Sequence, residues 1–101
     1  MAVKTKKDAV TALAEVNIDR RFFCEDGCIC GSLAELVECL GKMSPDTFHH
    51  HVTLSNNDFS NWVRHVLGDD KLAEDLLKAT DPQQARKMIK ERIKWLQKKA
   101  S

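Results

Sequence analysis

Apolar residues recur at helical spacing over most of the chain. Leu33, Leu36 and Leu40 fall on one face of a helix, because steps of three and four residues return to the same side. The same spacing marks four further segments, and Ser44-Pro45 predicts one more short helix. The predicted helices cover residues 7–16, 33–40, 45–51, 58–67, 71–78 and 82–99. The chain is therefore expected to be mainly helical.

Capping residues indicate where these helices begin. Ser32 stands three residues before Glu35, which is the spacing of a reciprocal capping box. Gly41 is expected to end the helix that Ser32 opens. The other expected N-caps are Ser44, Asn56 or Asn57, Asp69 or Asp70, and Asp81. A proline follows two of them at the first helical position, where its fixed φ favours a helix start.

A shorter pattern precedes the helix over 33–40. Asp26-Gly27 lies between two apolar runs, which predicts a β-hairpin over residues 21–30 with a two-residue type I′ turn. The expected fold class is mainly α (α+β), with a small N-terminal hairpin packed on a compact bundle of about five to six helices. The residues expected in the core are Phe23, Leu36, Phe59, Trp62, Val66, Leu76, Ile89 and Ile93.

Length and composition agree with one globular domain. The chain has 101 residues, of which 43% are hydrophobic and 31% are charged. We expect a single domain over residues 1–101, with a helical arm over about 1–20 and a helical body over 33–99. No apolar run is long enough for a membrane span or a signal peptide, so a cytoplasmic protein is predicted.

Charge is unevenly distributed along the chain. Residues 22–81 hold four Lys and Arg against eleven Asp and Glu, whereas residues 82–101 hold seven against one. One interpretation is that the basic last helix folds back on an acidic body. A basic surface for nucleic acid is the alternative, although the net charge of +1 weakens non-specific attraction to phosphates.

Four cysteines raise the question of a metal site. In a reducing cytosol they are expected to be thiols, core residues or ligands rather than disulfides. With a two-residue turn, Cys28 and Cys30 share one face of the hairpin with Phe23, and Cys24 points to the other face. The three hairpin cysteines then cannot all converge on one ion, which leaves Cys28 and Cys30 as a two-thiolate alternative. Buried cysteines that fill space as small hydrophobes are the simpler interpretation.

The histidine run does not change this interpretation. Successive residues on a helix point about 100° apart, so His49, His50 and His51 diverge. We therefore predict no metal site and no cofactor. The remaining candidate ligands are Cys28, Cys30, His49 and His51.

Several short motifs occur in a fixed order along the chain. They are Asp26-Gly27, Ser32-Leu33-x-Glu35-Leu36, His51-Val52, Asn57-Asp58-Phe59-x-x-Trp62, Gly68-Asp69 and Leu72-Ala73. Over residues 22–95 this set resembles DUF5752, a family of small domains of unknown function that is mainly archaeal. The resemblance implies the same order of elements and brings no reaction or ligand. It also implies aromatic or aliphatic residues, rather than cysteines, at the hairpin positions of relatives.

No catalytic signature stands out, so we predict a non-enzymatic protein-interaction module whose partner is another protein or a second copy of the chain. Its surface would lie on the amphipathic last helix. The residues of that surface are Lys87, Lys90, Lys94, Trp95 and Lys98. One alternative is a metal-binding or thiol redox-responsive domain that uses Cys28, Cys30 and a histidine. Another is nucleic-acid binding through the last helix.

Overall fold

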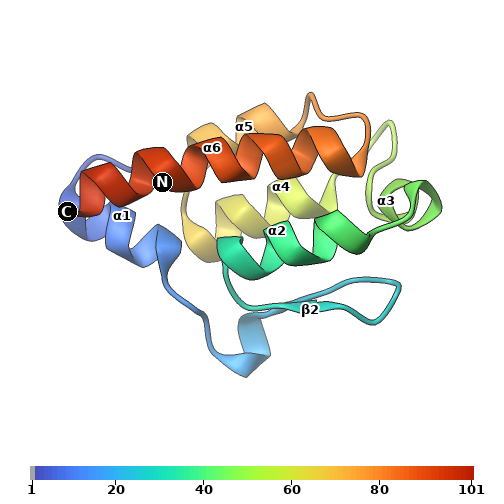
Figure 1. Ribbon diagram of the computed structural model, residues 1–101, viewed down its shortest axis with the longest axis horizontal. Coiled ribbons are helices and arrows are strands. Elements are labelled where there is room, and N and C mark those ends of the chain that lie inside the picture. The colour runs from blue at the N-terminus through green and yellow to red at the C-terminus, as the bar shows by residue number, and fades with distance from the viewer. Residues whose placement is uncertain (1) are drawn as a thin grey trace.

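Helices form most of the structure, a computed structural model that describes residues 2–101 (Figure 1). Its elements are α1 (Lys6–Leu13), η1 (Ile18–Arg20), β1 (Phe22–Phe23), β2 (Ile29–Cys30), α2 (Leu33–Lys42), α3 (Pro45–His51), α4 (Asp58–Trp62), η2 (Val63–Leu67), α5 (Asp70–Leu76) and α6 (Pro82–Ala100). The predicted fold class, a helical bundle with an N-terminal hairpin, is confirmed.

The N-terminal ends of six helices share one local structure. In each, a side-chain oxygen accepts a hydrogen bond from the backbone N–H three residues later, which satisfies a donor that the helix leaves unpaired. These N-caps are Thr5, which the sequence analysis did not predict, and Ser32, Ser44, Asn57, Asp69 and Asp81. The predicted capping box at Ser32 is only half formed, because the Glu35 carboxylate accepts from the Gly31 N–H instead.

Several predicted helix ends are wrong. The helix α1 ends at Leu13, and α5 ends at Leu76. Gly41 does not end α2, which continues to Lys42, and Arg86 of α6 packs against this turn. A Cβ on Gly41 would lie 3.2 Å from the Arg86 Nε. The glycine thus allows a close approach between two helices rather than a helix stop.

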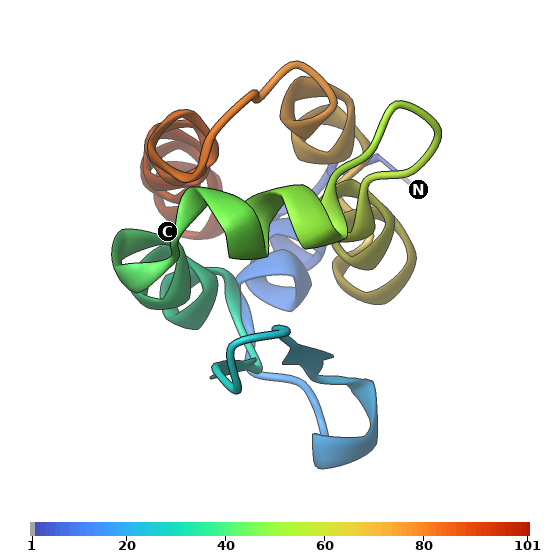
Figure 2. The same ribbon diagram turned by 90° about the vertical axis from the view of Figure 1, so that its right-hand side faces the viewer.

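The longest helix, α6, lies along both α1 and α2 (Figure 1). On the other side of α6, α5 packs against α4 and η2, and α3 crosses one end of the bundle (Figure 2). The hairpin lies against α2. Within residues 2–101, no helix is both long enough and apolar enough to span a membrane.

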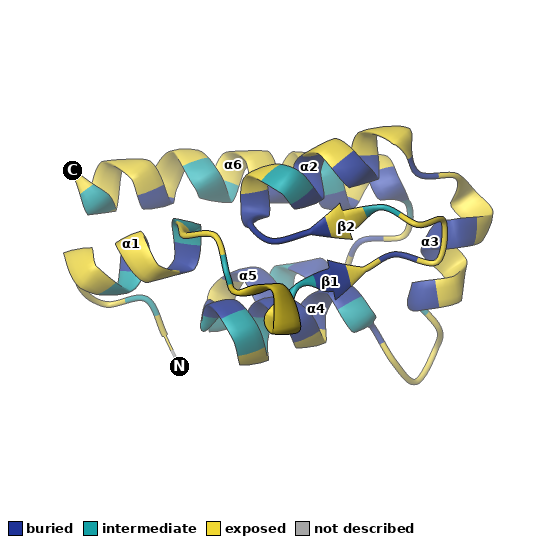
Figure 3. Ribbon diagram, turned by 90° about the horizontal axis from the view of Figure 1, so that it is seen from below, coloured by how far each residue is buried: buried dark blue, intermediate teal, exposed yellow. Residues whose placement is uncertain are grey.

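Aromatic rings join the hairpin to the helices. The Phe22 ring lies 5.1 Å from the Phe59 ring and 6.0 Å from the Trp62 ring, and Phe48 stacks on the other side of Phe59. Burial alternates along the two short strands, as Figure 3 shows. Phe22 is therefore buried, whereas Phe23 is 58% exposed. The prediction that Phe23 belongs to the core is wrong.

The other predicted core residues lie inside or at the edge of the core. Those that are buried are Leu36, Phe59, Trp62, Leu76 and Ile89. Val66 and Ile93 are half-buried and pack against the core.

Candidate functional site

A three-residue loop of Glu25, Asp26 and Gly27 closes the hairpin between Cys24 and Cys28. Gly27 has a φ of 92°, and its N–H donates to the Cys24 carbonyl at 2.9 Å. The Cys24 N–H in turn donates to the Cys28 carbonyl at 2.8 Å, so these two cysteines flank the loop directly. A three-residue loop with glycine in the left-handed region is a common hairpin connection. It replaces the predicted two-residue turn.

The longer loop shifts the strand pairing by one residue. Phe22 pairs with Cys30 and Phe23 pairs with Ile29, whereas the two-residue turn places Phe23 opposite Cys30. Because side chains alternate along a strand, a shift of one residue exchanges the two faces. The predicted orientation of Cys24 is therefore wrong. Cys24 is 5% exposed and lies on the inner side together with Cys30.

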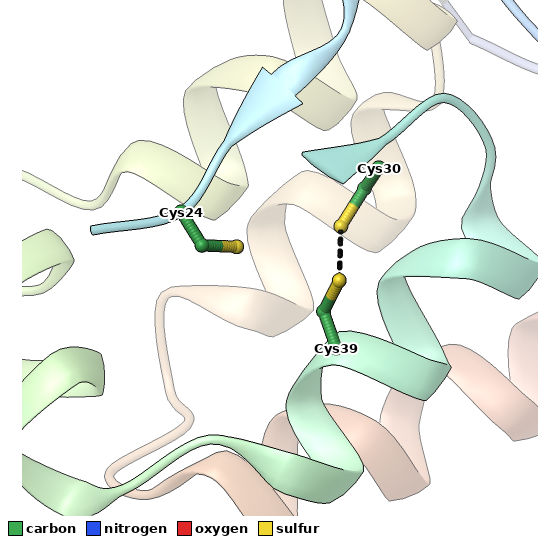
Figure 4. Close-up of side chains that lie close together, drawn as sticks. All are labelled: Cys24, Cys30 and Cys39. Carbon is green, nitrogen blue, oxygen red and sulfur yellow. Dashed lines mark hydrogen bonds between the residues drawn. The ribbon is translucent and has the colours of Figure 1, made fainter. Parts of the chain in front are cut away.

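Three sulfur atoms consequently converge between the hairpin and α2 (Figure 4). The Sγ atoms of Cys24, Cys30 and Cys39 all lie within 4.8 Å of one another. Cys24 follows β1, Cys30 lies on β2, and Cys39 lies on α2. The Cys30 and Cys39 sulfurs are 2.9 Å apart. The prediction that the hairpin cysteines cannot converge is wrong.

Cys28 completes the group through a disulfide bond with Cys39. The Cα atoms of the pair are 6.0 Å apart, within the usual range for a disulfide. The expectation that disulfides are absent is therefore wrong for this pair, whereas Cys24 and Cys30 are free thiols. All four cysteines of the chain thus form one group, which we call the cysteine cluster.

Hydrogen bonds hold the hairpin against the helices. The Glu25 N–H donates to the His51 Nε2 at 2.9 Å, and the Thr47 hydroxyl donates to the Glu25 carboxylate at 3.0 Å. At the other end of the hairpin, the Trp62 indole N–H donates to the Arg20 carbonyl at 2.9 Å. These contacts join the hairpin and the turn before it to α3 and α4, whereas the disulfide joins the hairpin to α2.

The two free thiols affect each other's acidity. A hydrogen bond from the Cys30 thiol lowers the pKa of Cys24, and the same bond raises the pKa of Cys30. Burial and the negative charges of Cys24, Glu35 and Asp26 raise the pKa of Cys30 further. Several thiolates at this position would therefore repel one another unless a cation offsets their charge.

The four cysteine residues differ in their exposure to solvent. Cys30 is fully buried and Cys39 is 2% exposed, so both lie in the interior together with Cys24. Cys28 is half-buried and lies at the edge of the core, beside the loop. It is the member of the cluster that small molecules in solution reach most readily.

The histidine run does not join the cysteine cluster. His51 is buried, and its Nδ1 lies 3.0 Å from the Asp58 carboxylate while its Nε2 accepts from the hairpin. The Nδ1 of His49 lies 2.8 Å from the Pro45 carbonyl. Over residues 2–101, the grouped ligand atoms within 4.8 Å come from cysteines alone. His49 and His51 are therefore not supported as partners of Cys28 and Cys30.

The sequence analysis excluded Cys24 from a shared site with Cys28 and Cys30, and it gave Cys39 no defined role. The spacing of Cys24 and Cys28 held the missing signal, because three residues between them suit a three-residue hairpin loop. The pair could then face each other on the same side as Cys30. Cys39 lies on the buried side of α2, where it meets that face.

The predicted interaction surface lies along α6. Trp95 is 43% exposed, and the Arg92 guanidinium lies 4.2 Å from the centre of its ring. The surface lysines are Lys87, Lys90, Lys94 and Lys98, all exposed. A groove of about 320 Å³ runs between α2 and α6 beside them. It is lined by Ala34, Val37, Glu38, Lys90, Ile93, Lys94 and Gln97.

Comparison with known proteins gives one match. The sequence profile described as "Family of unknown function (DUF5752)" matches residues 26–101, which include Cys28, Cys30 and Cys39. No curated protein and no solved structure matches the chain. The match covers most of the chain, and the family's function is unknown.

Proposed function

Because this chain belongs to the DUF5752 family, whose function is unknown, we propose a function from its own side chains: when its cysteines are reduced, it binds one zinc ion through the cysteine cluster. The observation that carries this proposal is the convergence of all four cysteines at one place. Zinc in structural sites prefers four thiolate or imidazole ligands in a tetrahedron. The cluster provides four sulfurs.

The distances within the cluster support a tetrahedral site. A Zn–S bond of about 2.3 Å separates neighbouring sulfurs by about 3.8 Å in a tetrahedron. The sulfurs of Cys24, Cys30 and Cys39 lie within 4.8 Å of one another, so small side-chain rotations bring them to this spacing. Reduction of the Cys28–Cys39 disulfide frees the fourth ligand and lets its two sulfurs separate.

The positions of the ligands suggest a structural role for the metal. Cys24, Cys28 and Cys30 come from the hairpin, and Cys39 comes from α2, so one ion would join the two elements. Four protein ligands leave no open position for a substrate, which is typical of structural zinc sites. The proposal also implies a reducing compartment such as the cytoplasm, where thiolates persist.

The charges near the cluster also favour a cation. The carboxylates of Asp26 and Glu35 raise the pKa of the Cys30 thiol, as the negative charge of the Cys24 thiolate does. Four thiolates without a counter-charge would be strongly disfavoured at this buried position. A divalent cation offsets part of that negative charge, and the thiolates lose their protons as it binds.

Metal content of the reduced protein tests the proposal. Untagged protein is purified with a reductant, freed of loosely held metal on a chelating resin, and analysed for zinc by mass spectrometry. We expect one zinc ion per chain for the natural sequence. Cys24→Ser and Cys39→Ser should each lose most of the zinc, because a three-thiolate site binds more weakly.

A matched control separates the cysteine cluster from the histidine run. The double variant His49→Ala with His50→Ala should keep its zinc, because neither side chain belongs to the cluster. Zinc that disappears with the histidines, or natural protein that holds no zinc, would contradict the proposal.

We also propose that the groove between α2 and α6 binds an amphipathic helix with acidic flanks, so that two lysines of the surface predicted on α6 take part in protein binding. Ala34, Val37 and Ile93 give the lining of the groove an apolar part, and Lys90 and Lys94 outnumber Glu38 among its charged residues. Helix-in-groove binding uses this combination of an apolar stripe and complementary charges.

A designed helical peptide with a leucine face and glutamate flanks tests this second proposal. Lys90→Glu with Lys94→Glu should weaken its binding, whereas Lys4→Glu with Lys6→Glu, at the other end of the chain, should not. Titration of an oligonucleotide in parallel distinguishes nucleic-acid binding. A peptide that binds both variants equally well would contradict the groove as its site.

A further inference from the structure

We propose that Cys28 is a site of oxidation by peroxide and that Cys39 resolves the oxidised sulfur, so that a disulfide replaces the metal. The release of metal rests on the zinc site proposed above, whereas the order of oxidation rests on the geometry of the cluster alone. Oxidation of Cys28 would thus determine whether the metal or the Cys28–Cys39 disulfide joins the hairpin to α2.

Access to solvent selects Cys28 as the first sulfur to react. Cys24, Cys30 and Cys39 are 5%, 0% and 2% exposed, whereas Cys28 is half-buried beside the loop. Oxidation of cysteine by peroxide depends on the exposure of the sulfur as well as on its chemistry. A peroxide molecule that reaches the edge of the cluster therefore meets Cys28 before the others.

The disulfide in the structure identifies the second sulfur. Cys28 and Cys39 are bonded to each other with their Cα atoms 6.0 Å apart, so the hairpin and α2 already hold this pair at bonding distance. Cys30 is the competitor, because its sulfur lies 2.9 Å from the Cys39 sulfur. The fold accommodates the Cys28–Cys39 bond while Cys30 remains a thiol.

The oxidation proceeds in two steps that balance. Hydrogen peroxide transfers one oxygen atom to the Cys28 thiol, which gives a sulfenic acid and one water molecule. The Cys39 sulfur then attacks the Cys28 sulfur, the S–S bond forms, and the hydroxyl leaves as a second water with the Cys39 proton. The two thiols together lose two electrons, which reduce the peroxide to two waters.

The same reaction removes two of the four metal ligands. Zinc bound by four thiolates keeps only Cys24 and Cys30 once the disulfide has formed. Two sulfurs do not complete a tetrahedral site, so the ion dissociates and these thiolates take up two protons from water. In the zinc-bound protein Cys28 and Cys39 are thiolates and have no protons to give. The two protons that complete the product waters therefore come from the solvent. Reduction by a dithiol restores the four ligands.

The first arm of the test uses reduced, metal-free protein with hydrogen peroxide and a sulfenic-acid trap. Cys39→Ser should accumulate the trapped adduct on Cys28, because its resolving sulfur is missing. Cys28→Ser should lose its thiols at least about tenfold more slowly than the natural sequence. Peptide mapping of the oxidised natural protein should give the Cys28–Cys39 pair.

The second arm repeats the oxidation on zinc-loaded protein in the presence of a coloured chelator. One zinc ion should be released for each Cys28–Cys39 disulfide formed. A first adduct on Cys24 or Cys30, a Cys30–Cys39 product, unchanged oxidation of Cys28→Ser, or a disulfide without zinc release would overturn the inference. Protein that holds no zinc before peroxide refutes the zinc site instead, and the first arm still decides the order of oxidation.

Discussion

At the scale of single residues, Gly27 is the position on which the cysteine cluster depends most. Its φ of 92° lies in the left-handed region, where an L side chain costs about 1–2 kcal/mol. No atom lies within 4 Å of the place that its Cβ would occupy, so backbone strain is the main cost of a substitution. This backbone conformation closes the three-residue loop and places Cys24 opposite Cys28 in the hairpin.

Gly27→Ala should lower the free energy of unfolding by about 1 kcal/mol, and Gly27→Asn should lower it less, because asparagine tolerates the left-handed region. Urea unfolding with a reductant and a chelator measures the effect on the loop without disulfide or metal. Equal stability of the alanine variant and the natural sequence would show that Gly27 does not hold this conformation in solution.

Asn57 offers a second prediction at this scale. Its side chain caps α4 by accepting from the Ser60 N–H at 2.9 Å and donates to the Leu76 carbonyl at 3.1 Å, and the residue is buried. Asn57→Ala should destabilise the protein by about 2–3 kcal/mol, since it removes a cap and leaves a buried carbonyl unpaired.

The neighbouring Asn56 provides a matched control for this substitution. It is exposed and bonds only nearby side chains, so Asn56→Ala should change stability by less than about 0.5 kcal/mol. Thermal unfolding of both variants makes the comparison. Similar losses for the two would argue against the buried bond to Leu76.

The sequence predicts the helix caps but not the hairpin register, because cap partners are close in the sequence and the partners that fix the register are far apart in it. Ser32, Ser44 and Asn57 each bond a backbone group three residues away, so a short stretch of sequence contains both partners. Asp26-Gly27 suits both a two-residue and a three-residue loop. The choice is decided by distant contacts, such as the hydrogen bond from the Glu25 N–H to His51.

At the scale of elements, one buried ion pair joins α5 to α6. Asp69 is fully buried, and its carboxylate accepts two hydrogen bonds from Arg92 at 2.8 and 2.9 Å. The same carboxylate caps α5 by accepting from the Leu72 N–H. Because Asp69 has no exposure to water, the charge depends on Arg92 for compensation.

Arg92→Met should therefore destabilise the protein by about 3–5 kcal/mol, because it leaves a buried carboxylate without its partner. Lys94→Met on the same helix is the control, and its exposed position predicts a change within about 0.5 kcal/mol. Denaturant unfolding of the two variants under identical conditions provides the measurement. A small effect at Arg92 would mean that water reaches Asp69.

Element boundaries show which parts of the fold the local pattern misses. The order of the six predicted helices follows from apolar spacing and caps, and the structure confirms this order. Gly41 was expected to end α2, but its lack of a side chain instead accommodates Arg86 from α6. The turn of π-helix at Val63–Leu67 likewise has no signal in the local pattern.

At the scale of the whole molecule, the hairpin is the element with the least structure of its own. Each strand has two residues, and its attachment to the bundle depends on Phe22, the bonds to His51 and Trp62, and the cysteine cluster. Two-stranded hairpins are at best marginally stable alone. A link between the hairpin and α2 should therefore affect the stability of the fold.

Zinc should stabilise the reduced protein, because an ion that binds only the folded chain shifts unfolding by mass action. At a free zinc concentration 100 times the dissociation constant, the gain is about 2.7 kcal/mol. Protein with the Cys28–Cys39 disulfide should gain little, since two of its four sulfurs are then unavailable. Thermal unfolding of both forms, with and without zinc, tests this prediction. An equal gain in the disulfide form would point to zinc bound elsewhere.

X-ray absorption at the zinc edge of reduced, untagged protein tests the central claim most directly, because it counts the atoms bound to the metal. The cysteine cluster predicts a single shell of four sulfurs at about 2.3 Å. A shell at about 2.0–2.1 Å from nitrogen or oxygen, as the histidine run would give, contradicts the four-cysteine site.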